Sequence, residues 1–218
     1  APAPVAPPSP LPFFAYCMDT HDSLKRTLPE QAALLKELGY DGAGHLWLDN
    51  VQERLETLDT AGLKLFQITM QVSMKEGTPP YDREKLEGVL PLLKGRGVQL
   101  CLLMQGMPPS DPSGDGRGVD IVREIADLAK PSGTEILLYP HANDWMEKVS
   151  DAVRIAEKAD RPNVGVMFNL CHWLKVDQEE NLRPVLESAL PRLRAVSING
   201  ADRADAIHAG KGDWLQPL

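Results

Sequence analysis

Short apolar runs alternate along this chain with longer amphipathic stretches, and this alternation constrains the fold more than any other feature. Each run is rich in Val, Ile, Leu, Phe or Met and nearly continuous, which is typical of parallel strands buried on both faces. The seven predicted strands are Phe13–Cys17, Asp41–Leu46, Lys64–Val72, Val98–Met104, Glu135–Leu138, Val164–Phe168 and Leu193–Ile198. Repeated strand–helix–strand units predict right-handed crossovers and one parallel sheet.

The segments between these runs have the spacing and the terminal residues of helices. Leu28–Leu38 repeats Leu and Ala every three or four residues, and it is followed by Gly39, a residue type that commonly follows the last turn of a helix. Asp144 is placed to cap a helix from Trp145 to Ala159, with Glu147 at the third helical position of a capping box. The sequence therefore predicts a helix between successive strands.

A parallel α/β sheet closes into a barrel or stays open and doubly wound. An open nucleotide-binding sheet has a Gly-rich turn directly after an early strand, and no such turn follows Cys17 or Leu46. The glycines of Ser113–Gly118 (SGDGRG) match no phosphate-binding spacing, and they predict a flexible loop over the mouth of a site. We therefore expect a (β/α)8 TIM barrel and no nucleotide cofactor.

The length of the chain limits the number of domains it can form. The 218 residues, 43% of them hydrophobic, are enough for one sizeable core. Residues 1–12 (APAPVAPPSPLP) predict a Pro-rich disordered tail, and residues 13–218 one barrel domain. Because only seven strand–helix units are visible, we expect a barrel that is truncated after its seventh strand. Such a barrel leaves two strand edges unpaired, which predicts a homo-oligomer that covers them.

Charge and hydropathy limit the partners. The chain has 23 basic and 31 acidic side chains, and a net charge of −8 argues against nucleic-acid binding. No apolar run approaches the roughly 18 residues of a membrane span, so no membrane partner is expected. The tail is compatible with the remnant of a cleaved export signal, so a cytoplasmic and an exported location both stay open.

Polar side chains collect where the predicted strands end, and all five histidines are among them. The residues at or just beyond these ends include His21, His45, Gln71, Gln105, His141, Asn169, His172, Asn199, Asp202 and His208. The loops after barrel strands meet on one rim. Histidine is both a metal ligand and a proton carrier near neutral pH. The sequence therefore predicts a functional site on this rim.

The cysteines and tryptophans leave open alternatives. Cys171 and His172 are neighbours, but adjacent strand residues point to opposite faces, which disfavours a nucleophilic Cys–His pair. No paired CxxC spacing indicates a cysteine-ligated zinc site. The rings of Trp145, Trp173 and Trp214 are either part of the core or an apolar platform for the face of a sugar.

Four segments carry a family resemblance. LYPH before residue 142 and NLCHW at 169–173, together with GYDGAGHLWL and VSINGAD, resemble the xylose isomerase-like TIM-barrel family. This family includes sugar isomerases, sugar epimerases and endonuclease IV-type enzymes. The resemblance runs from about Phe13 to the end of the sequence. It implies an isomerase, an epimerase or a lyase that acts on a small carbohydrate or a sugar derivative.

The resemblance also implies a divalent metal ion that polarises carbonyl and hydroxyl oxygens. By position, the strand-five Glu of the family is Tyr139 here, and its strand-six Asp is Asn169. Tyr and Asn supply no carboxylate, the ligand that Mg²⁺ and Mn²⁺ favour. Two outcomes stay open. One is a Zn²⁺, Mn²⁺, Co²⁺ or Mg²⁺ site at His141, His172 and His208, and the other is a metal-free pocket that hydrogen-bonds to hydroxyl groups.

These considerations assign roles to ten side chains. The residues expected to be catalytic are Tyr139, His141, Asn169 and His172. The residues expected to contact the substrate are His45, Gln71, Gln105, Trp173, Asn199 and Asp202. The alternative is a catalytically inactive carbohydrate-binding barrel that has kept the fold and lost the family's ligands.

Overall fold

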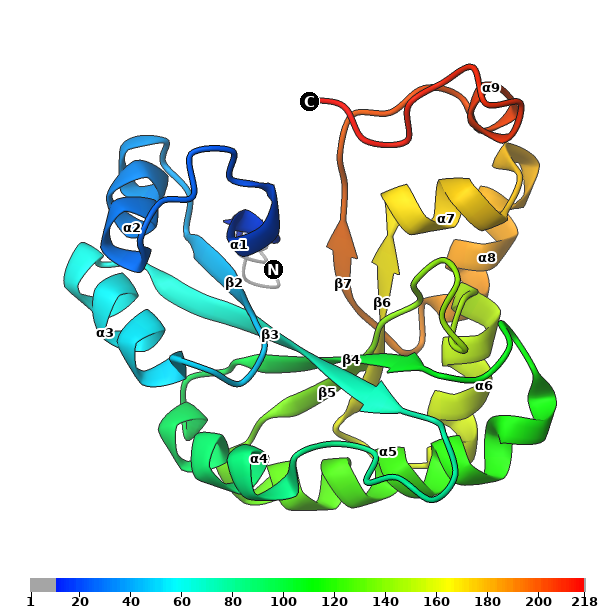
Figure 1. Cartoon of the computed structure of the whole chain (residues 1–218), viewed down its shortest axis with the longest axis horizontal. Helices are drawn as coiled ribbons and strands as arrows, with labels where there is room; N and C mark the ends of the chain where they lie inside the picture. The colour runs from blue at the N-terminus through cyan, green and yellow to red at the C-terminus, as the bar shows by residue number, and fades with distance from the viewer. Residues whose placement is uncertain (1–10, 218) are drawn as a thin grey trace, which may run out of the picture.

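The structure is a computed structural model that describes residues 11–217. Its strands form one parallel sheet in which each strand pairs with the next along the chain. The sheet curls around an interior, and the helices lie on its outer side (Figure 1). The strands are β1 (Phe14–Ala15), β2 (Gly42–Leu46), β3 (Lys64–Ser73), β4 (Gln99–Gln105), β5 (Glu135–Leu138), β6 (Val164–Asn169) and β7 (Leu193–Ser197).

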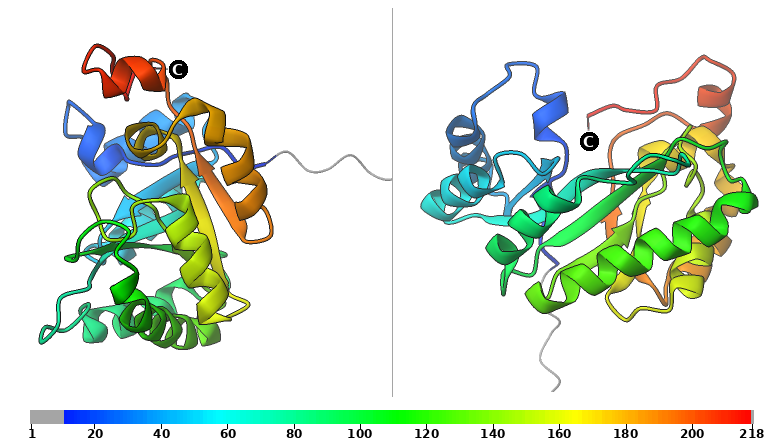
Figure 2. Two further views of the ribbon diagram at one scale, coloured as in Figure 1. Left: turned by 90° about the vertical axis from the view of Figure 1, so that its right-hand side faces the viewer. Right: turned by 60° about the horizontal axis from the view of Figure 1, so that its bottom comes forward.

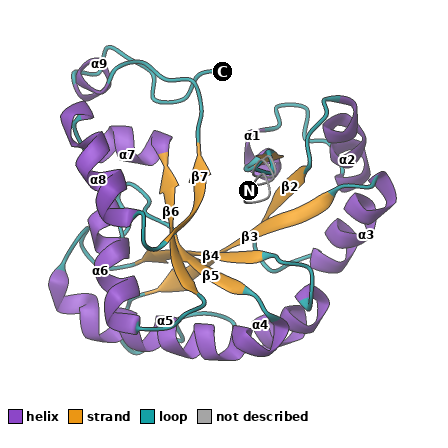
Figure 3. Ribbon diagram, turned by 180° about the vertical axis from the view of Figure 1, so that it is seen from behind, coloured by secondary structure: helices purple, strands orange, loops and turns teal. Residues whose placement is uncertain are grey.

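Helical segments connect successive strands (Figure 3). The α-helices are α1 (Met18–His21), α2 (Leu28–Glu37), α3 (Val51–Ala61), α4 (Arg83–Val89), α5 (Asp115–Ala129), α6 (Val149–Ala159), α7 (Leu170–Val176), α8 (Leu182–Ala189) and α9 (Ala204–His208). Short 3-10 turns are η1 (Leu90–Leu93), η2 (Pro112–Gly114), η3 (Lys130–Ser132) and η4 (Glu179–Asn181). None of the helices within residues 11–217 is both long and apolar enough to span a bilayer.

The curled parallel sheet confirms the predicted α/β barrel class and the seven predicted strands. The sheet does not close, because β1 and β7 are its two edges and do not pair with each other. The chain segments near these edges face one another across a gap (Figures 1 and 2). Within residues 11–217 the sheet has no eighth strand, as predicted. The predicted tail, residues 1–12, lies outside the described residues except for Leu11 and Pro12.

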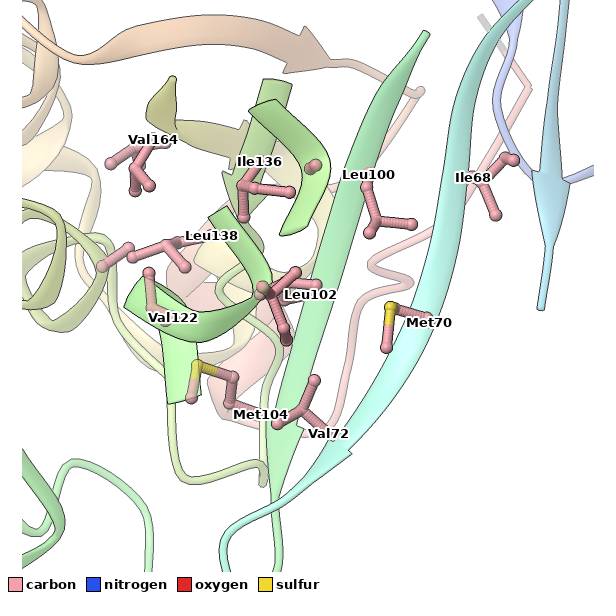
Figure 4. Close-up of a cluster of buried hydrophobic side chains, with 14 of the residues drawn as sticks. Ile68, Met70, Val72, Leu100, Leu102, Met104, Val122, Ile136, Leu138 and Val164 are labelled. Carbon is pink, nitrogen blue, oxygen red and sulfur yellow. The ribbon is translucent and has the colours of Figure 1, made fainter. Parts of the chain in front are cut away.

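Two apolar layers line the two faces of the sheet. On the outer face, alternate residues of β3 and β4 such as Met70 and Leu102 pack toward the helices (Figure 4). On the inner face a smaller cluster contains Cys101, Leu103, Leu137, Tyr139 and Met167. Because successive side chains of a strand point to opposite faces, this alternation sets Tyr139 inside the curled sheet, directly after β5.

Helix α6 begins at Val149, later than the predicted start at Trp145. The Trp145 ring is buried, and its Nε1 donates a hydrogen bond to a backbone carbonyl at 2.8 Å. The Glu147 carboxylate accepts a hydrogen bond from the backbone N–H of Asn143 at 2.9 Å instead of capping a helix at Asp144. The predicted helix start is therefore wrong because this segment packs as a turn around a buried tryptophan.

The loop predicted at Ser113–Gly118 is also wrong, because these residues form part of η2 and the first turn of α5. The Trp145 ring packs against this turn. A Cβ atom added at Gly114 or Gly118 would lie 2.8 Å or 2.5 Å from ring atoms of Trp145. The glycines therefore allow a helix to approach a buried ring closely, and they do not form a flexible cover.

Candidate active site

A cavity of about 440 Å³ opens toward the carboxyl ends of the strands, and every strand from β1 to β7 contributes to its lining. Strands β3 and β4 contribute Thr69 and Leu103 from within the strands, and the other strands contribute residues at or directly after their ends. This volume lies in the range of small-molecule sites, roughly 300–1,000 Å³. Five of the predicted site residues line the cavity: Tyr139, His141, Asn169, His172 and Asn199. The carboxyl ends of parallel strands meet at one edge, which explains why residues 60 positions apart share this space.

Asn169 organises the centre of the cavity. It is the last residue of β6, and its Oδ1 accepts a hydrogen bond from the backbone N–H of His172 at 3.2 Å, which caps α7. Its Nδ2 donates to the Tyr139 hydroxyl at 2.9 Å. Burial raises the pKa of Tyr139 well above its ordinary value. The phenol is therefore neutral, and its own O–H is free to donate to a ligand.

The rings of His141 and His172 are in contact beside this phenol. Their centroids are 3.8 Å apart with a 38° tilt, and both rings approach Tyr139 edge-on, at 5.9 Å and 5.8 Å. His141 Nδ1 lies 3.1 Å from the Ala142 carbonyl and 3.4 Å from Asp144 Oδ2. With Nδ1 donating to these oxygens, Nε2 of His141 is left as an acceptor. His172 Nδ1 is buried and has no partner within residues 11–217.

Both histidines are neutral at physiological pH. Burial lowers the pKa of His141, and the positive charge of Lys175 lowers it further. Burial, with the neighbouring His141 and Lys175, lowers the pKa of His172 to about 3. A neutral imidazole accepts a proton through one nitrogen and donates a hydrogen bond through the other. The pair therefore offers a proton acceptor and a hydrogen-bond donor in one cavity.

The cysteines of the cavity are protonated. Burial raises the pKa of the Cys17 thiol to about 12, and it also raises the pKa of Cys171. A thiol in this state is a poor nucleophile. The expectation that Cys171 and His172 point to opposite faces is wrong, because β6 ends at Asn169 and both residues lie in the first turn of α7 and line the cavity.

The structure does not place His45 or His208 at the cavity. His45 is buried, its Nε2 lies 2.7 Å from a backbone carbonyl, and its Nδ1 accepts a hydrogen bond from Arg54 at 3.2 Å. His208 Nε2 lies 2.8 Å from the Leu174 carbonyl, and its Nδ1 lies 3.0 Å from the Gln178 amide. Both rings are occupied by partners from the surrounding helices and loops.

Four other predicted contact residues also lie away from the cavity. Gln71 is exposed, and Gln105 is half-buried at the end of β4. Trp173 is buried and packs near Phe168 with ring centroids 6.0 Å apart, so it belongs to the core. The Asp202 carboxylate accepts hydrogen bonds from a backbone N–H at 2.9 Å and from a glutamine side chain at 2.8 Å, which fasten the segment after α9.

Several cavity residues were not assigned a role by the sequence, and of the three tryptophans whose place it left open, only Trp214 lines the cavity. Tyr16 and Thr69 line the cavity with their hydroxyl oxygens 3.4 Å apart. Lys175 and Trp214 also line it, with Lys175 Nζ 3.2 Å from the centroid of the Trp214 ring. His172 and Lys175 are three residues apart on one helix, which places both side chains on one face. This spacing is the sequence pattern from which Lys175 could have been predicted to lie at the site.

The residues present do not fit a divalent metal ion. Within residues 11–217 no three His, Cys, Asp or Glu side chains are placed together to hold a cation. His208 does not join His141 and His172. The two family ligand positions hold Tyr139 and Asn169, which bond to each other.

The family model described as xylose isomerase-like TIM barrel matches residues 32–216, so this chain belongs to that family. A search of curated protein sequences found no match.

Solved structures share the fold. The probable 3-DHS dehydratase AsbF from Bacillus anthracis is 16% identical, with 91% of this chain and 77% of that chain covered and a TM-score of 0.71. The 3-keto-D-glucoside 4-epimerase YcjR from E. coli is 17% identical (87% and 80% covered, TM-score 0.69). The D-allulose 3-epimerase from Methylomonas sp. in complex with D-allulose is 18% identical (87% and 72% covered, TM-score 0.70).

Proposed function

We propose that this protein isomerises or epimerises a keto sugar or a related sugar derivative by proton transfer at the His141–His172 pair. The observation that carries the proposal is the contact between two neutral imidazoles and a neutral phenol inside one cavity. Two proteins of the same fold, the 3-keto-D-glucoside 4-epimerase and the D-allulose 3-epimerase, act on carbohydrates, which supports a carbohydrate substrate here. The small-molecule size of the cavity agrees with such a ligand.

His141 is the general base in this proposal. Its Nε2 takes a proton from the carbon next to the substrate carbonyl, and the electron pair of the broken C–H bond moves to form an enediolate. Asp144, 3.4 Å from Nδ1, stabilises the imidazolium that results. The imidazolium then returns the proton to carbon. If the enediolate first turns its other face toward His141, return of the proton to the same carbon gives an epimer. If the proton goes to the neighbouring carbon, which is the former carbonyl carbon, the hydroxyl proton of the first carbon passes to the former carbonyl oxygen and the product is an isomer.

Tyr139 and His172 bind the enediolate oxygen. The Tyr139 O–H is neutral and free to donate, and the low pKa of His172, about 3, keeps that ring neutral beside the imidazolium of His141. Neutral donors held in a partly desolvated cavity stabilise a developing oxyanion without reorganising. Asn169 holds both groups in place through its bonds to the Tyr139 hydroxyl and the His172 backbone.

A panel of D-allulose, D-fructose, D-tagatose, common aldoses and 3-keto-glucosides tests this function. We expect at least one keto sugar to be converted at a rate that treatment with a chelator leaves unchanged. Binding of these sugars without conversion of any of them would support the alternative, an inactive carbohydrate-binding barrel. Conversion that requires an added divalent metal would contradict the assignment of the histidine pair.

We also propose that a second copy of the chain covers the open edge at β7. Val196 and Ile198 are apolar and more than half exposed there, and a two-fold axis pairs an edge strand with its own copy in antiparallel orientation. Light scattering is expected to give a dimer, and Val196→Lys is expected to give a monomer. Leu190→Lys on the exposed end of α8 is the matched control and should stay dimeric. A monomeric wild-type protein would contradict this arrangement.

A further inference from the structure

Lys175 lines the cavity without a counter-ion. It lies on α7, three residues after His172, and is half-buried. Its Nζ is 3.2 Å from the centroid of the Trp214 ring. Within residues 11–217 it forms no ion pair, and burial lowers its pKa. The aromatic face compensates the charge only in part, because it offers no hydrogen-bond acceptor to the ammonium group.

Among residues 11–217, no Asp or Glu side chain lines this cavity, although the chain as a whole carries a net charge of −8. Two acidic side chains beside the cavity have other partners. Asp19 pairs with Arg54, and Asp144 lies 3.4 Å from His141. Lys175 therefore brings a positive charge into a cavity to which residues 11–217 contribute no acidic side chain. A cavity with one sign of charge and low-dielectric walls concentrates ligands of the opposite sign.

We propose that Lys175 binds a carboxylate or phosphate group of the substrate, which makes the cavity selective for acidic sugar derivatives over neutral sugars. This inference rests on the proposed function for the position of the substrate. A carboxylate or a phosphate forms a charge-assisted hydrogen bond with an ammonium group. The same helix face carries His172, so the anionic group binds on the side of the cavity next to the reacting pair.

The Trp214 ring positions the ammonium group. A lysine side chain has four rotatable bonds, and packing over an aromatic face restricts them. The charge of Lys175 acts on both histidines, since it contributes to the lowered pKa of each of them. An anion at Lys175 is therefore within electrostatic range of the proton-transfer centre.

Binding measurements test the inference without any turnover. D-glucuronate and D-glucose are titrated into the full chain at neutral pH, and the indole N–H resonance of Trp214 is followed by NMR. We expect D-glucuronate to bind about tenfold more tightly than D-glucose. In Lys175→Met this preference is expected to disappear, whereas Lys175→Arg and the remote control Lys94→Met should keep it. Equal affinity for the two sugars in the wild type, or a preference that survives Lys175→Met, would overturn the proposal.

Inorganic phosphate separates the two sources of the anion. If phosphate displaces D-glucuronate at a lower concentration than acetate does, a sugar phosphate is assigned, and the reverse order assigns a sugar acid. His141→Gln is expected to keep the preference for D-glucuronate, because that residue acts in proton transfer. A protein that binds D-glucuronate selectively but converts no sugar would thus contradict the proposed function while it supports the role of Lys175.

Discussion

Replacement of His141 with glutamine is expected to lower kcat/KM on the best keto sugar by about 10²–10⁴-fold, the usual contribution of a general base. Glutamine keeps hydrogen-bonding capacity at this position but has no nitrogen that accepts a proton from carbon. The measurement is steady-state turnover of the purified variant. The free energy of unfolding should change by less than about 1 kcal/mol, because the ring is partly exposed in the cavity.

His21→Gln is the matched control, because His21 also lines the cavity but is exposed. This variant should retain activity within a factor of about three, as a substitution outside the reacting group. The lowered pKa of His141 also predicts a pH profile. The neutral base persists as the pH falls through the ordinary histidine range, and kcat/KM should decline only below it. Equal losses in His21→Gln and His141→Gln would contradict the assignment.

Replacement of Asp19 with alanine is expected to destabilise the fold by about 3–5 kcal/mol, the cost of leaving a buried charge unpaired. The Arg54 guanidinium is fully buried. It donates hydrogen bonds to Asp19, to Gln31 Oε1 at 2.8 Å and to His45 Nδ1 at 3.2 Å. This network links α1, α2, β2 and α3, so its loss destabilises the packing of these helices against β2. Chemical denaturation measures the change.

Asp59→Ala is the control, since Asp59 forms an ion pair with Arg96 on the surface. Exposed pairs of this kind contribute about 0–1 kcal/mol. If Asp19→Ala is no less stable than Asp59→Ala, the prediction that Asp19 stabilises the buried charge of Arg54 is wrong.

The stability contributed by Asp19 should depend on pH. Burial acts to raise its pKa, but the neighbouring His45 ring and the charge of Arg54 outweigh burial and lower it. A lowered pKa in the folded state means that this contribution is complete above the ordinary pKa of an aspartate. It is lost as the pH falls through the lower, folded-state value. The difference in the free energy of unfolding between the wild type and Asp19→Ala should therefore become smaller in strong acid.

The sheet could be predicted because its strands are continuous apolar runs, a pattern that local sequence records. The prediction failed around Trp145, where long-range packing decides the conformation. A ring buried against Gly114 and Gly118 turns an expected loop into a helix and delays the start of α6. Neither contact is visible in the spacing of nearby residues.

The sequence could predict that four side chains meet in one cavity, because they come at the ends of neighbouring strands: Tyr139, His141, Asn169 and His172. His45 could not be separated from them by sequence, because its partner Arg54 looks like an ordinary surface residue of an amphipathic helix. Lys175 was overlooked because a lysine near a helix end is common. Its position over Trp214, without an ion-pair partner among residues 11–217, distinguishes it from other lysines.

Hydrogen exchange in D₂O tests the proton-transfer role of the histidine pair most directly. Chelator-treated protein is incubated with each keto sugar of the panel, and ¹H NMR follows the C–H signal next to the carbonyl. We expect this signal to decay with at least one sugar, and to decay at least about 100-fold more slowly with His141→Gln. No exchange above the level of His141→Gln with any sugar, or exchange that appears only after a divalent metal is added, would contradict metal-independent proton transfer at this site.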